Sequence, residues 1–306
     1  MSETLLQLNN VESAYGPVRA IRGVSLRVQR GQIATVLGSN GAGKTTTVRL
    51  LNGVLEPTTG SARVFGFDVA TQSDDVRKYI GVVFQSPSLD GKLSVEENMF
   101  HQGHLYGLQG NHLHQRTSEL LSRLGLSERK NDYVEKLSGG LQRRVEIAKS
   151  LLHQPKLLLL DEPSTGLDPG ARIAVWELLL ELRERDKITI LLTTHLLEEA
   201  EKCDKLVIVD KGEIVANGSP TELKLEIGND IISIGARNIE VLLKKIIEKF
   251  GTIASLFDSS IRIERENGHE FIPQLVSSFP NEISSITLSK PTLEDVFIHK
   301  TGRKFS

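Results

Sequence analysis

An eight-residue segment, Gly38 to Thr45, has the residue types and spacing needed to hold a polyphosphate. It reads GSNGAGKT, follows the apolar run 32–37 and fits G-x-x-x-x-G-K-[ST]. Its glycines allow backbone N–H groups to wrap around phosphates, and a lysine supplies positive charge to the β- and γ-phosphates. A helix that begins at Lys44 directs its positive end at the same anion. We therefore expect nucleotide contacts from Gly38, Ser39, Asn40, Gly41, Ala42, Gly43, Lys44, Thr45 and Thr46, and a Mg²⁺ ligand in Thr45.

Two adjacent carboxylates provide the second chemical signal. Leucines occupy positions 157–160, and Asp161 and Glu162 follow them directly. Four apolar residues predict a buried strand, whose end would carry Asp161 toward a Mg²⁺ ion. Glu162, one residue further along, is placed to hold a water molecule and to act as the general base for attack on a γ-phosphate.

A third segment, LSGGLQRR at 137–144, predicts another anion site. Ser138 occupies the N-cap position of a helix expected at 140–152, and Gly139 and Gly140 expose backbone N–H groups at its positive end. This helix start is far from Lys44 in the sequence. One nucleotide would need both helix ends only if they approach it from opposite sides.

The elements that must position these residues alternate between strand and helix. Strands are expected at 32–37, 79–84, 156–161 and 187–193, with helices at 44–52, 140–153 and 170–185, so we expect a mostly parallel sheet covered by helices. Short alternating runs over 5–28 predict antiparallel strands, with Tyr15 in a turn. Residues 86–136 are helical in period. After Gly218-Ser219-Pro220, from 231 onward, the order β-α-β-β-α-β predicts a ferredoxin-like unit that ends in an additional helix.

Bulk composition limits the classes of protein to consider. The 306 residues are 39% hydrophobic, the net charge is −2, and there is one cysteine, Cys203. The hydrophobic fraction favours a packed core, and the net charge argues against nucleic acid as a partner. A single cysteine excludes an internal disulfide framework and suits the cytosol. The densest apolar run, 157–160, is too short to span a bilayer. A function at a membrane would therefore require a partner that supplies the membrane part.

The motifs, in the order P-loop, Gln85, LSGG, Asp161-Glu162 and His195, resemble the ATP-binding subunit of an ABC transporter over about residues 4–220. The C-terminal sequence PTLEDVFIHKTGR is similar to the tail of bacterial type-2 exporters of drugs, antibiotics or polysaccharides. The resemblance implies a P-loop NTPase (RecA-like) α/β core with an antiparallel β subdomain. It implies an ABC ATPase domain at 1–220, a helical subdomain at about 86–148, and a C-terminal α+β accessory domain at 221–306.

The resemblance also assigns roles to residues. Two subunits would close head to tail, so that Ser138, Gly139 and Gly140 contact the γ-phosphate of the nucleotide held by the partner's Lys44. Tyr15 would stack on adenine, Gln85 would contact Mg²⁺ or the attacking water, and His195 would contact the γ-phosphate. The segment 164–168, which ends in the expected nucleotide-site residue Asp168, would cross between the subunits. Leu141 departs from the family, which usually has glutamine there.

The activity implied is hydrolysis of ATP with Mg²⁺, coupled to export. The expected partners are an integral membrane permease and a second copy of the chain or a homologous ATPase subunit, at the cytoplasmic face of the membrane of a bacterial-type or archaeal-type cell. The helical segment 86–100 would contact the permease, and residues after Pro220 would steady the dimer or regulate it. The alternatives are a soluble ABC ATPase acting on ribosomes or DNA and a P-loop kinase or GTPase. The single P-loop and the lack of sustained heptads disfavour the first, and LSGG disfavours the second.

Overall fold

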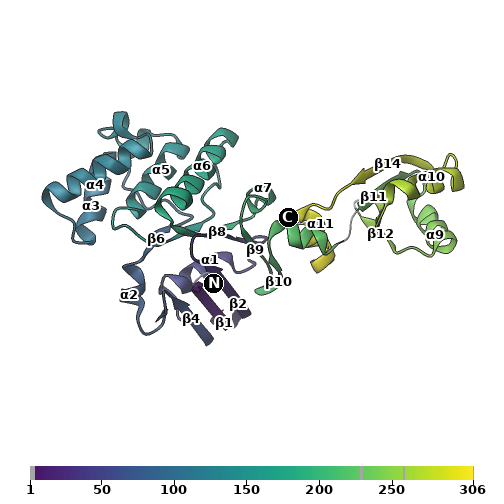
Figure 1. Ribbon diagram of the computed structural model, residues 1–306, viewed down its shortest axis with the longest axis horizontal. Helices are drawn as coiled ribbons and strands as arrows, with labels where there is room; N and C mark the ends of the chain where they lie inside the picture. Colours follow the sequence, from purple (N-terminus) through teal and green to yellow (C-terminus); the bar gives the residue numbers. More distant parts are fainter. Residues whose placement is uncertain (1–3, 228–229, 258, 306) are drawn as a thin grey trace. The chain divides into compact units, whose positions relative to one another are not determined.

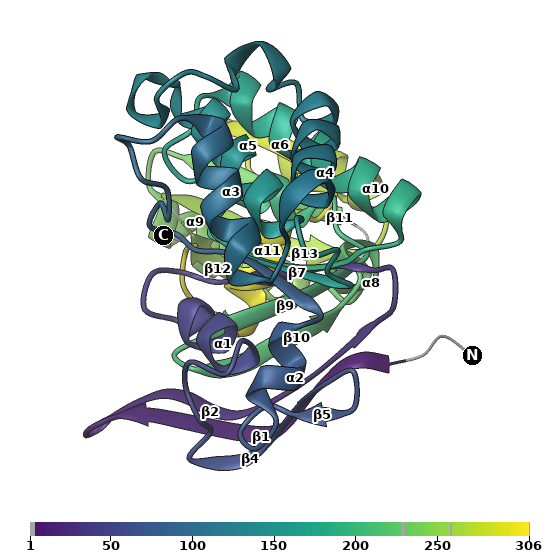
Figure 2. The same ribbon diagram turned by 90° about the vertical axis from the view of Figure 1, so that its left-hand side faces the viewer.

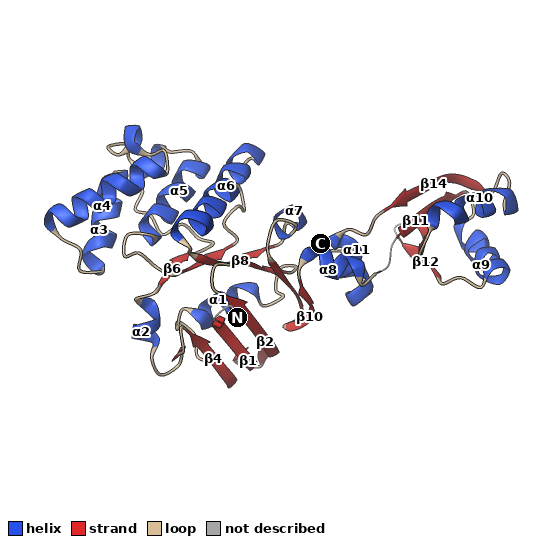
Figure 3. Cartoon of the chain, viewed as in Figure 1, coloured by secondary structure: helices blue, strands red, loops and turns tan. Residues whose placement is uncertain are grey.

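The computed structural model describes residues 4–227, 230–257 and 259–305. They form two compact units, one ending at Asn217 and the other running from Gly218 to Phe305. Figure 1 labels the elements of both units along the chain, and Figure 3 colours the same view by helix and strand. Each unit has its own buried apolar core.

A six-stranded sheet forms the centre of the first unit, in the order β10-β9-β3-β8-β7-β6. The strands are β3 (Ile33–Leu37), β6 (Ile80–Val83), β7 (Leu157–Asp161), β8 (Thr189–Thr194), β9 (Lys205–Asp210) and β10 (Glu213–Gly218). All residues of β3, β7 and β8 are buried, as expected for parallel strands that are covered on both faces. Leu37 pairs with Thr194, and Asp161 pairs with Thr193, so the carboxyl ends of these three strands lie together.

A second sheet packs beneath the first, with helix α1 (Lys44–Leu51) in contact with strands of both sheets. Its strands are β1 (Thr4–Tyr15), β2 (Val18–Gln29), β4 (Thr59–Val64) and β5 (Phe67–Asp68), in the order β2-β1-β4-β5. The view in Figure 2 places this sheet at the opposite end of the unit from α3 and α4. Strand β1 continues through Asn9-Asn10 with a shift in its register to β2, and Asn10 has φ 45°. Tyr15 ends β1, before the expected turn.

Helices α3 (Val95–Leu105), α4 (Gly110–Arg123), α5 (Gly139–Ser150) and α6 (Pro169–Asp186) lie on the other side of the central sheet from the second sheet (Figure 1). Helix α2 (Ser73–Arg77) contacts β5 and β6 on the side of the second sheet, and α7 (Leu197–Ala200) contacts β3 and β8. Short 3₁₀ turns are η1 (Ser127–Arg129) and η2 (Val134–Lys136). The expected helix over 86–100 is wrong in its first half. Residues 86–94 are a loop, and α3 starts after Ser94, which forms a capping box with Glu97.

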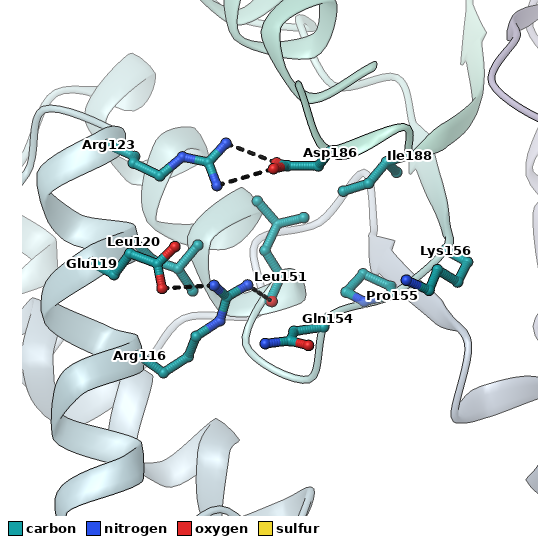
Figure 4. Close-up of a pocket in the computed structure, with 10 residues that line it drawn as sticks. All are labelled: Arg116, Glu119, Leu120, Arg123, Leu151, Gln154, Pro155, Lys156, Asp186 and Ile188. Carbon is teal, nitrogen blue, oxygen red and sulfur yellow. Dashed lines mark hydrogen bonds and ion pairs between the residues drawn. The ribbon is translucent and has the colours of Figure 1, made fainter. Parts of the chain in front are cut away.

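Two arginines of α4 bind the C-terminal ends of the neighbouring helices α5 and α6 (Figure 4). Arg116 donates to the carbonyl oxygen of Leu151 at 3.0 Å, at the C-terminal end of α5, and Arg123 binds both carboxylate oxygens of Asp186 at the end of α6. A cavity of about 230 Å³ lies between these contacts. A cationic side chain near a helix C-terminus satisfies a carbonyl that lacks a partner within the helix, which makes the Arg116 contact favourable. The Arg123 contact is an ion pair with a carboxylate.

The second unit contains a four-stranded antiparallel sheet in the order β12-β13-β11-β14. The strands are β11 (Asp230–Ala236), β12 (Ala254–Phe257), β13 (Ser260–Arg265) and β14 (Ile283–Ser289), and the helices are α8 (Pro220–Leu225), α9 (Ile239–Phe250), α10 (Gly268–Ser278) and α11 (Leu293–Thr301). Alternate isoleucines of β11 and β13 pack with α9 and α10 in one core. The strand order matches the expected ferredoxin-like arrangement.

Helix α8 was not expected, although its signal is in the sequence. Ser219 and Glu222 form a capping box, and Pro220 occupies the first helical position. Within the described ranges, no helix combines the length and the apolar character needed to cross a bilayer.

Candidate nucleotide-binding and hydrolysis site

The loop between β3 and α1 requires glycine at two positions for different reasons. Gly43 has φ 107°, and a Cβ atom there would lie 2.7 Å from the carbonyl oxygen of Ala20. At Gly38, a Cβ atom would lie 2.6 Å from the carbonyl oxygen of Val209. Both distances are below any real Cβ contact, so the loop is confined by β2 and β9 and keeps its shape only with glycine.

The N-terminus of α1 is left available to an anion. In the part of the chain that the structure describes, no side chain caps this helix, and its first turn contains no acidic residue. A cavity of about 440 Å³ opens there, lined by Ala20, Asn40, Gly41, Gly43, Lys44, Thr45, Thr46, Gln85 and Glu162. Uncapped N–H groups, a helix dipole and a lysine in one cavity fit a polyphosphate. All of these lining residues except Ala20 were expected at the site.

Lys44 is 5% exposed, and its ammonium group contacts three oxygen atoms. It donates to the carbonyl oxygens of Gly38 at 2.8 Å and Ser39 at 3.1 Å. Its third contact, at 3.0 Å, is Oε1 of Glu162. The lysine of the P-loop therefore touches the carboxylate expected to be the general base.

Glu162 is the residue on which the expected catalytic groups converge. Its Oε2 atom lies 3.3 Å from Nε2 of Gln85 and 3.1 Å from Nδ1 of His195. The Thr165 hydroxyl donates to the same oxygen at 3.0 Å. Glu162 also has φ 48°, which is rare outside glycine, and its backbone N–H donates to the Thr193 hydroxyl at 3.0 Å. A strained backbone held by a neighbouring strand is typical of functional positions.

The surroundings of Glu162 keep its carboxyl group ionised. Burial acts to raise its pKa, but hydrogen bonding and charge attraction from Lys44, with smaller contributions from Thr165 and His195, outweigh burial and lower the pKa below the ordinary value. An ionised carboxylate can accept a proton from water, which is the property that a general base requires.

The three residues expected at Mg²⁺ line a neighbouring cavity of about 340 Å³. They are Thr45, Gln85 and Asp161. Asp161 is 1% exposed, and its Oδ1 atom accepts a hydrogen bond from the Thr193 hydroxyl at 2.6 Å. One carboxylate beside hydroxyl and amide oxygens is the oxygen donor set that Mg²⁺ prefers in phosphate-binding sites. The residues therefore fit this ion.

The LSGG segment has the expected local structure and lies apart from Lys44. Ser138 is the N-cap of α5, and its hydroxyl accepts from the backbone N–H of Leu141 at 3.4 Å. Ser138 and Gly139 are exposed, and among the described residues that line the cavity at Lys44 none belongs to this segment. Gly140 packs closely against Ala171 at the start of α6. The chain thus has two separate helix N-termini that follow glycine-containing loops, at Lys44 and at Gly139.

Gln142 does not substitute for the glutamine that the family usually has at the position of Leu141. The Gln142 side chain donates to the carbonyl oxygens of Val134 and Leu137, both at 3.1 Å. It therefore braces the backbone before the LSGG segment and does not take the place of the glutamine that Leu141 replaces.

Two further residues expected at the nucleotide site, Tyr15 and Asp168, lie at the end of β1 and at the N-cap of α6. Tyr15 is 44% exposed and pairs with Val18 across the β1–β2 hairpin, whose second strand carries Ala20 into the cavity at Lys44. Asp168 is exposed, and its carboxylate caps α6 by accepting from the Ala171 N–H at 2.9 Å. Sequence reasoning missed Thr193 and Ala20, and it assigned no contact with Glu162 to Thr165, which lies in the segment 164–168. Thr193 reaches the site because β8 pairs with β7.

The sheet order, the loop after β3 and the carboxylates after β7 define a P-loop nucleoside triphosphatase with a helical insertion. The model of the ABC transporter family matches residues 21–165. A daunorubicin resistance ATP-binding protein of Streptomyces coeruleorubidus is 36% identical over 99% of this chain and 97% of its own length. A Nod factor export ATP-binding protein I of Paraburkholderia xenovorans is 39% identical over 99% of both chains. The chain belongs to the ABC transporter family, as an ATP-binding subunit.

Solved structures agree with this assignment. The structure of cbiO1 from Clostridium perfringens, part of the ABC transporter complex cbiONQ, superimposes with a TM-score of 0.68. It is 27% identical and covers 81% of this chain and 96% of its own. A further ATP-binding subunit of an ABC transporter has a TM-score of 0.65 at 31% identity, covering 73% of this chain and 93% of its own. The expected family, fold class and ATPase activity coupled to transport are confirmed.

Proposed function

We propose that this chain binds and hydrolyses ATP to drive export of a substrate through a separate membrane permease, at the cytoplasmic face of the cell membrane. The observation that carries the ATPase part is the meeting of Lys44, Gln85 and His195 at the Glu162 carboxylate. The export part is supported by relatives that cover nearly the whole chain and are named for drug resistance or Nod factor export.

In this proposal each residue has a defined task in hydrolysis. The backbone N–H groups at Gly41 and Gly43, with Lys44, bind the β- and γ-phosphates. The Glu162 carboxylate takes a proton from the attacking water, Gln85 orients that water, and His195 donates to the γ-phosphate. The exposed Tyr15 ring stacks on adenine. Mg²⁺, when bound by Thr45, Gln85 and Asp161, would neutralise charge that develops on the phosphates.

The active unit is a head-to-tail dimer, formed with a second copy or a homologous subunit. The exposed Ser138 and Gly139 present the positive end of α5 to solvent rather than to Lys44 of the same chain. Such an end stabilises an anion brought by another molecule. Each nucleotide would therefore lie between Lys44 of one subunit and α5 of the other, with the segment that ends in Asp168 between the subunits.

The permease would dock in a groove beside the Gln85 loop. This cavity of about 490 Å³ is lined in part by the exposed apolar side chains of Val54, Phe84, Leu105 and Tyr106. Ser88 lies at its edge, so the groove includes part of the segment expected to contact the permease. An amphipathic cytoplasmic helix of a membrane protein suits such an apolar groove with a polar rim.

The two structural units would have separate tasks. The unit that ends at Asn217 would be the ATPase domain, with α3, α4 and α5 as its helical subdomain. The unit from Gly218 to Phe305 would steady the dimer or regulate it, because it has its own core and contributes none of the expected catalytic residues.

Affinity purification from membranes of the native cell tests this function. We expect one polytopic membrane protein to co-purify in a fixed ratio, and we expect ATP to drive substrate transport by the reconstituted complex. Single cysteines at positions 54 and 105 should crosslink to that protein, whereas cysteines on α9 should not. Recovery of ribosomes or DNA in place of a membrane protein would support the soluble ABC ATPase class instead.

A further inference from the structure

Strand β14 forms one edge of the sheet in the second unit (Figure 1). In the part of the chain that the structure describes, β14 pairs with β11, and no strand pairs with its outer edge. Alternate backbone N–H and C=O groups of an edge strand point outward and can pair with a further strand. Most of its seven residues are exposed: Ser284, Ser285, Thr287, Leu288 and Ser289.

Strand β14 lacks the features that usually protect an edge from pairing. Such edges are short, or they carry charges or proline. The opposite edge strand, β12, has only four residues, and Nζ of Lys304 lies 5.9 Å above the ring of its Phe257. The sequence of β14, ISSITLS, contains neither a charge nor a proline. Its register to β11 shifts only near Ile283, so residues 285–289 form a regular stretch.

This regular stretch is complementary to itself. An antiparallel pair centred on Thr287 places this residue opposite itself and Ile286 opposite Leu288 of the other copy. Ser285 then lies opposite Ser289. Ile286 and Leu288 share a face of the sheet, because they oppose two isoleucines of β11 that belong to the buried core. Apolar pairs and hydroxyl pairs across two strands both stabilise a sheet.

The charges that flank β14 favour the same antiparallel arrangement. Glu282 precedes the strand and Lys290 follows it. On their own chain they contact Lys245 and Asp230, each at 2.8 Å, and the Lys290 side chain is 77% exposed. In an antiparallel pair, Glu282 of each copy lies at the same end as Lys290 of the other. A parallel pair would instead bring like charges together, which is unfavourable.

We propose that β14 pairs with β14 of a second copy and joins two four-stranded sheets into one continuous sheet. This inference rests on the proposed function, in which the second unit steadies the dimer. An antiparallel pair of identical strands has twofold symmetry, as has a dimer in which each Lys44 faces α5 of the other chain. A short strand pair is weak on its own, but it adds to the affinity when the nucleotide sites already hold the same two chains together.

Disulfide crosslinking of the full-length chain tests the pairing and its register. In a Cys203→Ala background, Thr287→Cys places two thiols directly opposite each other, at a Cα separation of about 4.5–5.5 Å that a disulfide can bridge. We expect oxidation to give a disulfide-linked dimer, rapidly with Mg-ATP and more slowly without nucleotide. Ser255→Cys, at an exposed position on the opposite edge strand β12, is the matched control and should stay monomeric.

A charge at the centre of β14 tests whether the pairing contributes to activity. Thr287→Lys places two like charges directly opposite each other. We expect the subunit concentration that gives half-maximal specific ATPase activity to rise about fivefold or more. The kcat at saturating subunit concentration should stay unchanged. Thr287→Val, which keeps an uncharged β-branched side chain, and Ser255→Lys on β12 should both behave as wild type. Thermal melting of each variant establishes that it is folded.

Equal crosslinking of Thr287→Cys and Ser255→Cys would overturn the proposal. So would a folded Thr287→Lys whose ATPase activity depends on subunit concentration as that of the wild type does. A disulfide from Thr287→Cys to the permease, in place of one between two copies, would also overturn it and would assign the edge to a strand of that partner. These results are distinguishable from failure of the proposed function, because ATP hydrolysis by the wild type is measured over the same range of subunit concentration.

Discussion

Nζ of Lys44 lies 3.0 Å from Oε1 of Glu162, although 118 positions separate them in the sequence. Both side chains are more than nine-tenths buried, so this is a buried ion pair between the phosphate-binding lysine and the carboxylate at the end of β7. The same lysine is the expected partner of the β- and γ-phosphates. In the proposed function, binding of ATP would make Lys44 share or exchange its contact with Glu162, so the arrival of the phosphates would free the proposed general base.

Replacing the base should separate binding from hydrolysis. In Glu162→Gln the amide cannot accept a proton from water, so we expect kcat to fall on the order of 100-fold or more. ATP affinity should be retained, and stable dimers should accumulate with Mg-ATP. Size-exclusion chromatography with ATP and with ADP measures this, and the wild type serves as the control. Hydrolysis at the wild-type rate would remove Glu162 from its assigned role.

Removing Lys44 should change the pH dependence of stability in the absence of nucleotide. The folded-state pKa of Glu162 is lowered in the wild type, so the ionised form stabilises the fold above the ordinary glutamate pKa, and this stabilisation declines as pH falls through the lowered value. In Lys44→Met burial is no longer opposed by the main attraction. We expect the free energy of unfolding at neutral pH to fall by about 3 kcal/mol, because the buried carboxylate is left without its main partner.

The difference in the free energy of unfolding between the wild type and Lys44→Met should decrease as the pH falls, because Glu162 becomes protonated in both proteins. Denaturant titrations at several pH values measure the difference. Lys78→Met, which removes an exposed ion pair with Asp75, is the matched control and should show little change at any pH. A loss in Lys44→Met that is independent of pH would contradict the assigned coupling.

Mixing two inactive variants should restore activity if each site is built from two chains. Lys44→Ala disables the P-loop, and Gly139→Asp places a carboxylate at the exposed start of α5, where it repels phosphate. Each variant alone should be inactive. In an equal mixture, half of the dimers contain one site with neither substitution, so about a quarter of the wild-type rate is expected.

A steady-state ATPase assay of the mixture, with each variant alone at the same total concentration, measures this recovery. If no activity returns while mixed dimers are demonstrably present, the two half-sites do not come from different chains. An engineered chain that carries both substitutions should remain inactive when it is mixed with either single variant.

Cys203 should be almost unreactive in the folded protein. Its side chain is buried, and burial raises the pKa of the thiol to about 11. Since the thiolate is the nucleophile, the reactive fraction at pH 8 is on the order of one in a thousand. We expect a maleimide to label Cys203 slowly in the native state and rapidly in denaturant. Mass spectrometry measures the labelled fraction over time. Cys203→Ala should retain ATPase activity, and rapid native labelling would contradict the buried position.

The sequence by itself determined the parts of the site that are built from neighbouring residues. The loop from Gly38 to Thr45, the cap at Ser138 and the buried strand before Asp161 are local, because glycine conformation, helix capping and strand burial depend on residues a few positions apart. Family resemblance added Gln85 and His195, and the β-α-β-β-α-β order of the second unit followed from its hydrophobic periodicity.

The tertiary structure alone decided how these parts meet. Strand β8 lies between β3 and β7. This order brings His195, the residue after β8, to the Glu162 carboxylate, and it brings the Thr193 hydroxyl to the Asp161 carboxylate. The start of α3 at Val95 and the bonds from Arg143 to the Gln85 loop also depended on contacts between distant segments. The hydrophobic periodicity of a segment does not predict such pairings. Their free energy comes from the order of the sheet and from burial across the whole unit, not from neighbouring residues.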